Sequence, residues 1–218
     1  MKPAPFGYEK PASLDGVLAM LEKHGDEARI LAGGQSLLAT LNMRLSAPKL
    51  LVDVSGLEPL RGISVENGQL RIGALTTHAE LTASKEIAML APLLGQAVPH
   101  IAHPAIRNRG TLGGSLAHAD PAAELPACML ALDAEIEIAG PAGTRRIDAP
   151  AFFHGLYETD LKPSEVLTAV LIPSAAEGCR SGFSEFSRRT GDFAMAGLAF
   201  HARFDDCLLY TSDAADEE

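Results

Sequence analysis

The chain has 218 residues, of which 47% are hydrophobic and 21% are charged, so it is long and apolar enough for one large domain or two small ones. Its 28 acidic and 18 basic residues give a net charge of −10, which argues against nucleic acid as a partner because phosphates attract basic surfaces. No apolar run is long enough for a membrane span, and the N-terminal segment lacks the apolar core of a signal peptide.

The cysteines Cys128, Cys179 and Cys207 are far apart and form no C-x-x-C pair, so the sequence predicts no metal site and no iron–sulfur cluster in this chain. An odd number of cysteines without a signal peptide indicates free thiols and a cytoplasmic location. Tryptophan is absent and aromatic residues make up only 5%, which argues against a base-stacking surface.

The first 55 residues predict a compact unit in which strands and helices alternate. We expect, in chain order, a helix that begins after the N-cap Ser13 and ends at Gly25, a strand at 28–31, a helix at 35–44, and a strand at 50–54 that contains Asp53.

A second unit is expected from residue 56 to 175. Its pattern predicts a strand at 69–75, helices at 77–83 and 87–97, an ordered loop at 99–109, a helix at 122–132, a hairpin of strands at 134–139 and 144–147, and a strand at 166–172. A Gly-Pro-Ala-Gly turn indicates the hairpin, and Pro173 stops the last strand.

Two further strands, at 184–189 and 194–204, are expected to open a third unit that spans 176–204. The acidic segment 205–218 breaks the alternation without turn chemistry, and we interpret it as a non-native tail that truncates this unit.

Two glycine-rich turns are the most informative motifs. The first is AGGQS at 32–36, and the second, about 80 positions later, is TLGGS at 111–115. A Gly-Gly step removes two Cβ atoms, so backbone N–H groups can converge on an anion. Gln35 and Ser36 add polar side chains to the first turn, and the stretch from Thr111 to Ser115 is expected to offer consecutive N–H donors. Together the turns predict a clamp around a large phosphate-bearing ligand.

Three well-known glycine-rich motifs are absent from the chain. The sequence contains neither G-x-G-x-x-G nor G-x-x-x-x-G-K-[ST], so it indicates neither a Rossmann dinucleotide site nor a P-loop. The first turn also departs from G-x-S-x-G, because Leu38 stands where a nucleophile elbow needs glycine.

Two carboxylates follow the second turn. Asp120 can cap the next helix, and Glu124 lies one helical turn further on, where it can accept hydrogen bonds from a sugar or ribityl hydroxyl. The pair can also be a general acid and base, but no nucleophile or metal ligand lies near it in sequence. Among the cations, Arg107, Arg109, Arg188 and Arg189 are either pyrophosphate partners, a docking patch or simply solvated charge.

The chain contains, in order, AGGQS, T-x-G-G-S-x-A-x-A-D-P-A-A-E, EVLTAVLIP and SRRTGDFA. Together these motifs resemble the FAD-binding medium subunit of molybdenum hydroxylases, a family that includes aerobic carbon monoxide dehydrogenase and xanthine dehydrogenase. The resemblance runs from about residue 6 to residue 204. It implies an α+β fold: a two-part FAD-binding domain, made of a small N-terminal α/β subdomain and a larger α+β subdomain, followed by the start of a truncated C-terminal sheet-and-helix subdomain.

The same resemblance implies that FAD lies between the first two subdomains. The implied FAD-binding residues are Ala32, Gly33, Gly34, Gln35 and Ser36 in the first turn, Thr111, Leu112, Gly113, Gly114 and Ser115 in the second, and Asp120, Glu124, Leu167 and Phe193 beyond them. The chain departs from the family at 184–187, where SEFS replaces a segment that often carries lysine.

The function implied is that of a FAD-dependent oxidoreductase subunit with no catalytic acid, base or metal of its own. A molybdopterin-binding large subunit would oxidise the substrate, a small subunit would relay electrons through [2Fe–2S] clusters, and this chain would pass them from FAD to an external acceptor. The expected assembly is a heterotrimer or a dimer of heterotrimers. Two alternatives stay open: an assembly module of the same complex that does not retain FAD, and a standalone flavin oxidase.

Overall fold

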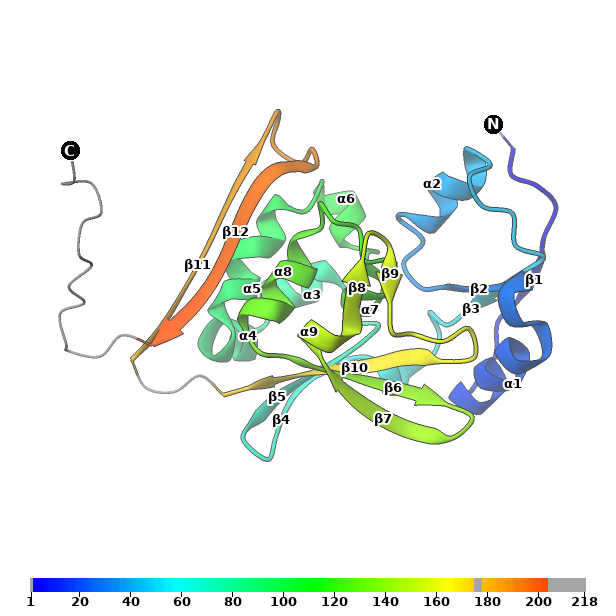
Figure 1. Cartoon of the computed structure of the whole chain (residues 1–218), viewed down its shortest axis with the longest axis horizontal. Helices are drawn as coiled ribbons and strands as arrows, with labels where there is room; N and C mark the ends of the chain where they lie inside the picture. Colours follow the sequence, from blue (N-terminus) through cyan, green and yellow to red (C-terminus); the bar gives the residue numbers. More distant parts are fainter. Residues whose placement is uncertain (1, 175–177, 204–218) are drawn as a thin grey trace, which may run out of the picture.

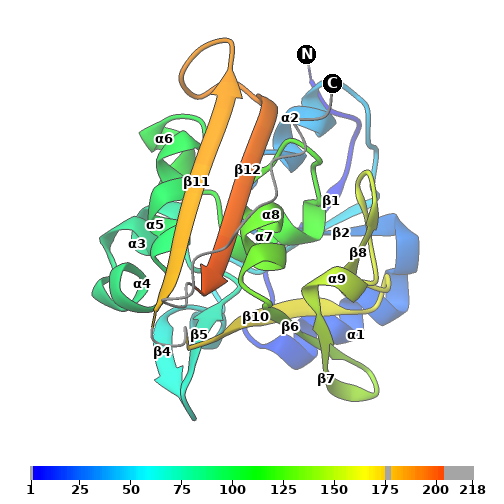
Figure 2. The ribbon, with the colours of Figure 1, turned by 60° about the vertical axis from the view of Figure 1, so that its left-hand side comes forward.

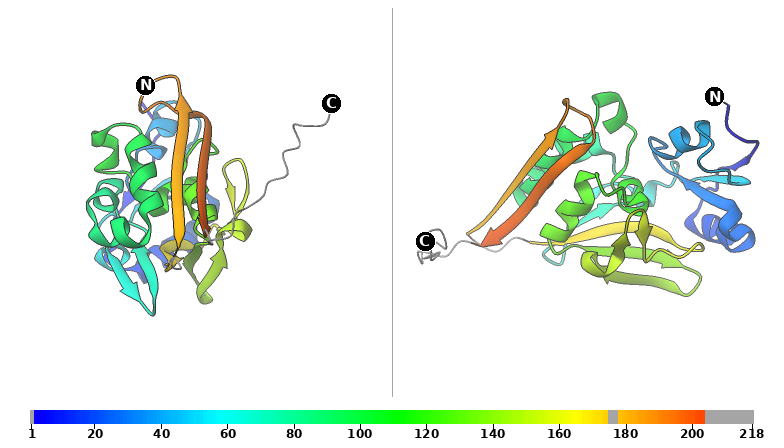
Figure 3. Two further views of the ribbon diagram at one scale, coloured as in Figure 1. Left: turned by 90° about the vertical axis from the view of Figure 1, so that its left-hand side faces the viewer. Right: turned by 45° about the horizontal axis from the view of Figure 1, so that its top comes forward.

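The computed structural model describes residues 2–174 and 178–203 and arranges their elements along one long axis (Figure 1). The N-terminal unit lies at one end, a sheet with its helices forms the middle, and a long hairpin lies at the other end (Figures 1 and 3). Within these residues, no helix combines the length and apolar character needed to cross a membrane.

The N-terminal unit is a small parallel sheet with an amphipathic helix packed on it. Its strands, in the order β1-β3-β2, are β1 (Gly7–Glu9), β3 (Leu50–Asp53) and β2 (Ala28–Leu31). Helix α1 (Leu14–His24) begins after Ser13, whose hydroxyl accepts a hydrogen bond from the Gly16 N–H at 3.2 Å. The helix buries Val17 and Leu21. Two short helices, η1 (Gly25–Glu27) and α2 (Leu37–Asn42), complete the unit.

The middle of the molecule is built on an antiparallel sheet. Its strands, in spatial order, are β4 (Ile63–Glu66), β5 (Gln69–Gly73), β10 (Val166–Pro173), β6 (Glu135–Gly140) and β7 (Gly143–Asp148). The central strand β10 is buried from Val166 to Ile172, because neighbouring strands flank it on both edges and helices cover it. A fully buried strand of this kind reads as a continuous apolar run rather than as an alternation.

Short helices form a layer over this sheet (Figure 1). They are α3 (His78–Ala83), α4 (Lys85–Leu90), α5 (Pro92–Ala97), η3 (Val98–His100), α6 (Pro104–Arg107), α7 (Leu112–His118) and α8 (Glu124–Ala131). Between the helices and the sheet lies the main core, in which Leu94, Leu116, Met129, Ile136 and Phe152 are fully buried. The remaining short elements are η2 (Glu58–Leu60), α9 (Ala149–Phe152), β8 (Phe153–Gly155) and β9 (Glu158–Thr159).

The C-terminal part described is an antiparallel hairpin of β11 (Cys179–Ser187) and β12 (Ala194–Arg203). Figure 2 shows the hairpin lying across the helical layer, where β11 contacts α5 and β12 contacts α8. The Gln96 side chain fixes this contact, since its Oε1 accepts a hydrogen bond from the Phe183 N–H at 3.1 Å.

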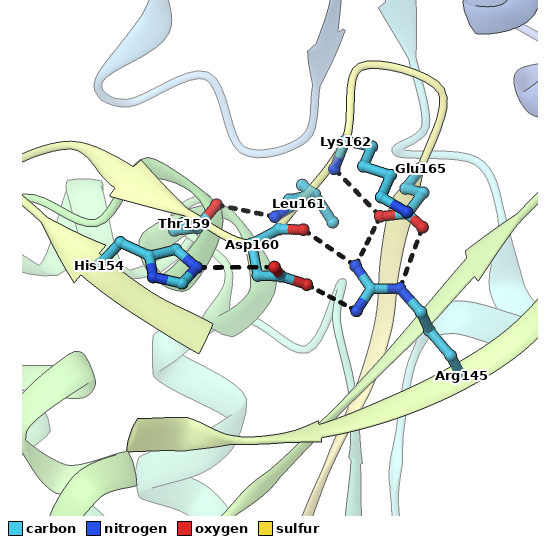
Figure 4. A network of polar contacts seen from close by, with 7 residues as sticks. All are labelled: Arg145, His154, Thr159, Asp160, Leu161, Lys162 and Glu165. Carbon is cyan, nitrogen blue, oxygen red and sulfur yellow. Dashed lines mark hydrogen bonds and ion pairs between the residues drawn. The ribbon is translucent and has the colours of Figure 1, made fainter. Parts of the chain in front are cut away.

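A polar network joins β7 to the chain that leads into β10 (Figure 4). The Arg145 guanidinium donates to Asp160 Oδ2 at 2.7 Å and to Glu165 Oε1 and Oε2 at 3.0 and 2.7 Å. His154 Nε2 lies 3.5 Å from the second oxygen of Asp160. The guanidinium beside Glu165 holds the pKa of that carboxyl below its ordinary value, and Arg145 does the same for Asp160.

The α+β fold is confirmed, and most predicted elements lie within a few residues of their expected ends. The expected single helix at 87–97 is wrong, because α4 ends at Leu90 and Pro92 begins a new helix. The expected loop at 99–109 contains the short helices η3 and α6. Strands β1, β4, β8 and β9 and helices α7 and α9 were not predicted. The proposed tail at 205–218 lies outside the described residues, and the unit boundaries stay a prediction.

Candidate functional site

The two glycine turns, far apart in sequence, touch in the structure. A Cβ atom placed on Gly33 would lie 2.1 Å from the carbonyl oxygen of Arg109 and 3.0 Å from the Cα atom of Gly110. Real side chains do not approach a backbone this closely, so the absence of a Cβ atom at position 33 is what lets the turns meet.

The first turn links β2 to α2 and keeps its backbone donors available. Gly34 has φ of 73°, a left-handed conformation that favours glycine. The Gln35 Nε2 donates to the Gly33 carbonyl oxygen at 3.1 Å. Within the described residues, the N–H groups from Gly33 to Ser36 have no hydrogen-bond acceptor. The backbone of the first turn is therefore compatible with an anion site, and the binding role of these residues stays a prediction.

The second turn differs from the expectation, because its N–H groups are already bonded. The Leu112 N–H donates to Thr76 O at 2.9 Å, and the Gly113 N–H donates to Ala74 O at 2.8 Å. The Gly114 N–H donates to Thr111 Oγ1 at 3.1 Å, and the Ser115 N–H donates to Thr111 O at 3.0 Å. The prediction of consecutive free donors from Leu112 to Ser115 is wrong. The second turn contributes close packing of its backbone rather than free N–H groups.

Close packing explains the glycines of the second turn. A Cβ atom on Gly113 would lie 2.6 Å from the Cβ atom of Ala74, at the end of β5. The ring of His78 lies behind the turn, 2.9 Å from where a Cβ atom on Gly110 would be, and the His78 N–H donates to the Gly110 carbonyl at 2.9 Å. Burial lowers the pKa of His78 to about 4, so the imidazole ring that packs against this turn is uncharged at pH 7.

A cleft of about 270 Å³ opens where the turns meet. It is lined by Ala32, Gly33, Ser55, Arg61, Leu75, Thr77, Asn108, Arg109 and Thr111. The predicted residues Ala32, Gly33 and Thr111 are thus brought together, while Ser55, Arg61, Thr77 and Asn108 were missed. Thr77 is the first residue of the predicted helix at 77–83 and Asn108 lies in the predicted loop at 99–109, but no local pattern marks Arg61, which follows η2.

Asp120 and Glu124 lie at the junction of α7 and α8. Asp120 Oδ1 accepts the Ala122 N–H at 2.9 Å, and its Oδ2 accepts the Tyr157 hydroxyl at 3.2 Å. Glu124 is the first residue of α8 and is half-buried. Burial, aided by the charges of Glu185 and Asp120, raises the pKa of Glu124 to about 7. Its carboxyl can therefore donate as well as accept a hydrogen bond near neutral pH.

The raised pKa of Glu124 predicts a pH-dependent stability. An acid whose pKa is higher in the folded chain stabilises the fold fully below its ordinary pKa, near 4.5, and this stabilisation is lost as the pH rises through about 7. The glutamine in Glu124→Gln cannot ionise. The free energy of unfolding of this variant is therefore expected to exceed that of the wild type by about 2 kcal/mol at pH 8 and to equal it at pH 4. Urea unfolding of the flavin-free chains measures this, with the exposed Glu22→Gln as control. Identical pH profiles for Glu124→Gln and wild type would refute it.

The last two predicted residues lie in other surroundings. Leu167 is 5% exposed and packs in the core below the helices, whereas Phe193 is 73% exposed at the tip of the hairpin. Neither lines the cleft between the turns. Their roles as flavin contacts stay predictions.

A second cleft, of about 560 Å³, lies where the hairpin tip meets the end of the helical layer. Its lining comes from Pro99, His100 and the run 185–191, which includes Arg188 and Arg189. Arg107 is committed elsewhere, because its Nη1 donates to the carbonyl oxygens of Pro99, Ile101 and Ala102 at 3.2, 2.8 and 3.1 Å. Of the four cations considered, Arg109 alone lines the cleft between the turns.

Close-packed glycines, a first turn with unpaired N–H groups and two arginines lie at one polar cleft, an arrangement that suits an anionic ligand. Residues 4–175 match the family described as the FAD binding domain in molybdopterin dehydrogenase, and the chain belongs to this family. The chemistry of the cleft fits FAD, because Gly33, whose N–H group is unpaired, and the guanidinium groups of Arg61 and Arg109 line it and suit a diphosphate.

Similar proteins of known function cover nearly the whole chain. The chain is 45% identical over 206 residues to the 6-hydroxypseudooxynicotine dehydrogenase complex subunit alpha of Paenarthrobacter nicotinovorans, covering 94% of this chain and 70% of that protein. It is 39% identical to the carbon monoxide dehydrogenase medium chain of Hydrogenophaga pseudoflava, over 91% of this chain and 69% of that one.

Solved structures show a similar fold over nearly the same part of the chain. The carbon monoxide dehydrogenase of Hydrogenophaga pseudoflava that lacks the Mo-pyranopterin moiety superposes with a TM-score of 0.92 at 38% identity, over 94% of this chain and 71% of that chain. Quinoline 2-oxidoreductase from Pseudomonas putida 86 gives 0.87 at 45% identity, over 91% of this chain and 69% of that chain.

Proposed function

We propose that this chain is the FAD-binding electron-transfer subunit of a molybdenum hydroxylase. One observation carries the proposal: the two glycine turns of the matched family region meet at a cleft that is lined by Gly33, with its unpaired N–H group, and by two arginines. The partners are a molybdopterin-binding large subunit, on which substrate is oxidised, and a small subunit with [2Fe–2S] clusters. Bound FAD supplies redox chemistry in which electrons are exchanged singly or in pairs, which suits a link between such clusters and an external acceptor.

The task of the protein in this function is to bind and orient. The first turn offers N–H donors from Gly33 to Ser36, and the Arg109 carbonyl oxygen, just before the second turn, lies against Gly33 of the first. Glu124, half-buried and ready to donate or accept, suits a hydroxyl of the nucleotide. The remaining predicted site residues are part of the same proposal.

We also propose a cytoplasmic location. Cys128 and Cys179 are free in the described structure, and burial raises the pKa of the Cys128 thiol to about 12, which keeps it protonated and unreactive. Fractionation of the native cells tests this, because recovery in a membrane or extracellular fraction would contradict it.

Purification of the chain together with its partners tests the proposed function. Visible flavin absorbance at one FAD per chain, bleached when the substrate of the partner is added, is the expected result. A folded chain that carries no flavin in the intact complex would instead favour the assembly module. Oxidation of an organic substrate by the chain alone would favour the standalone oxidase.

Gly114→Val is expected to abolish FAD retention, with at least about a 10-fold weaker affinity, while the fold survives. Gly114 is exposed, and a Cβ atom there would lie 2.8 Å from Thr111 Oγ1 and 3.8 Å from the Cβ atom of Ala32, on the side of the first turn. Flavin absorbance per chain and the thermal midpoint measure the two effects. Ala117→Val, exposed on the same helix α7, is the control. Full flavin content in Gly114→Val would remove the second turn from the site.

A further inference from the structure

Two arginines line the cleft between the glycine turns, and their guanidinium groups make few short contacts with the described residues. Arg61 reaches it from the segment between η2 and β4, and Arg109 reaches it from the residues just before the second turn. The chain has a net charge of −10, so two cations lining one cleft stand out against the rest of the molecule.

The Arg61 guanidinium is only loosely held. Its Nη2 donates to the Ser55 carbonyl oxygen at 3.3 Å, its Nη1 lies 3.9 Å from Glu80 Oε1, and its Nε lies 4.0 Å from Glu58 Oε1. These ion pairs are at the outer limit of contact, and their carboxylates are 52% and 83% exposed. Buried Nε has no hydrogen-bond partner among the described residues. A guanidinium carries five donors, so most of its capacity is unused.

The side chain of Arg109 is also available to a ligand. Its backbone carbonyl packs against Gly33, which fixes where the side chain begins, but the exposed side chain makes no hydrogen bond or ion pair with the part of the chain that the structure describes. Arg107, two residues earlier, shows the contrast, because three backbone carbonyls accept from its Nη1. Arg61 and Arg109 are thus available to a ligand while Arg107 is structural.

The size of the cleft limits which part of FAD it can hold. At about 270 Å³ it lies just below the roughly 300–1,000 Å³ of pockets that enclose a whole drug-sized ligand, so it suits one part of FAD rather than the whole dinucleotide. Its lining includes two guanidinium groups and Gly33, whose N–H group is unpaired, and these donors match the doubly anionic diphosphate rather than an uncharged ring.

We propose that Arg61 and Arg109 bind the diphosphate of FAD in this cleft, together with the free N–H group of Gly33, and that the flavin ring lies outside it. The inference rests on the proposed function and deepens it, because it assigns the charge partner that the glycine motifs do not contain. Arg61 is expected to contribute more to diphosphate binding than Arg109. The Ser55 carbonyl oxygen and the carboxylates of Glu58 and Glu80 orient the Arg61 guanidinium at the cleft, whereas the exposed Arg109 side chain adds a second positive charge.

Titration of the flavin-free full chain tests the inference. FAD binding is followed by flavin fluorescence, and ADP, which carries the diphosphate without the flavin, is measured by competition. Arg61→Met is expected to weaken FAD and ADP by the same factor, about 10- to 100-fold, and to reduce the salt dependence of both. Arg146→Met, on β7, removes a charge away from the cleft and is expected to leave both affinities unchanged.

The possible results distinguish failure of the proposed function from failure of the arginine assignment. A wild-type chain that binds no FAD overturns the proposed function and the inference with it. Wild-type FAD binding with unchanged affinity in Arg61→Met overturns the role of Arg61 and leaves flavin binding intact. A loss for FAD but not for ADP places Arg61 at the flavin half and overturns the diphosphate assignment.

A second variant keeps the test valid if Arg61→Met does not fold. Arg109 is exposed, so Arg109→Met is expected to fold like wild type and to weaken FAD and ADP alike, by about 3- to 10-fold. Unchanged affinity for both ligands in Arg109→Met, in that case, overturns the two-arginine subsite.

Discussion

Gly33→Ala is expected to weaken FAD binding about 100-fold. The new Cβ atom would lie 2.1 Å from the Arg109 carbonyl oxygen, so the two turns must separate before it fits. Separation moves the free amides of the first turn away from Arg61 and Arg109, and a ligand held from both sides loses one side. Titration of flavin-free protein with FAD, followed by fluorescence, measures the loss.

The control for this substitution is Gly95→Ala in α5. No atom lies within 4 Å of a Cβ atom on Gly95, so the same methyl group meets open space there. Gly95→Ala is expected to leave FAD affinity unchanged and to stabilise the helix by about 0.5–1 kcal/mol. If Gly33→Ala binds FAD as tightly as Gly95→Ala does, contact between the turns is not required for the site.

Elements whose signals are local were predicted well from sequence. The helix α1 follows from Ser13, Gly25 and the apolar spacing between them, and the β6–β7 hairpin follows from its turn. Strand β1 has three exposed residues and exists because it pairs with β3, more than forty positions later, so nothing in its own sequence marks it. The break at Pro92 was readable, since proline favours the first turn of a new helix.

The site was predictable as motifs and not as geometry. The glycine turns are visible in the sequence, but their contact depends on which carbonyl faces Gly33. The engaged amides of the second turn depend on Ala74 and Thr76, which follow β5 and come close only in the folded chain. Arg61 has no motif around it, because its role arises from the position of η2 beside the turns. Long-range packing therefore decides which backbone donors and which cations a ligand meets.

Arg145→Met is expected to lower the free energy of unfolding by about 2–4 kcal/mol at pH 7. The Glu165 side chain is only 8% exposed, and Arg145 Nη2 and Nε satisfy both of its oxygens (Figure 4). Methionine keeps much of the length of the side chain but leaves that carboxylate buried without its charge partner. Urea unfolding monitored by circular dichroism measures the change, with flavin removed so that ligand binding does not contribute.

The pH dependence of this loss identifies its cause. Arg145 holds the pKa of Glu165 below its ordinary value, so the stabilisation is present above that ordinary value, near 4.5, and is lost as the pH falls through the lowered one. In Arg145→Met the carboxyl protonates more readily, and the deficit should therefore shrink towards pH 4. Adding Glu165→Gln removes the unpaired charge and is expected to restore part of the stability at pH 7. A deficit that is equal at both pH values and unchanged by Glu165→Gln would mean that lost packing of the Arg145 chain, rather than the buried carboxylate, destabilises the variant.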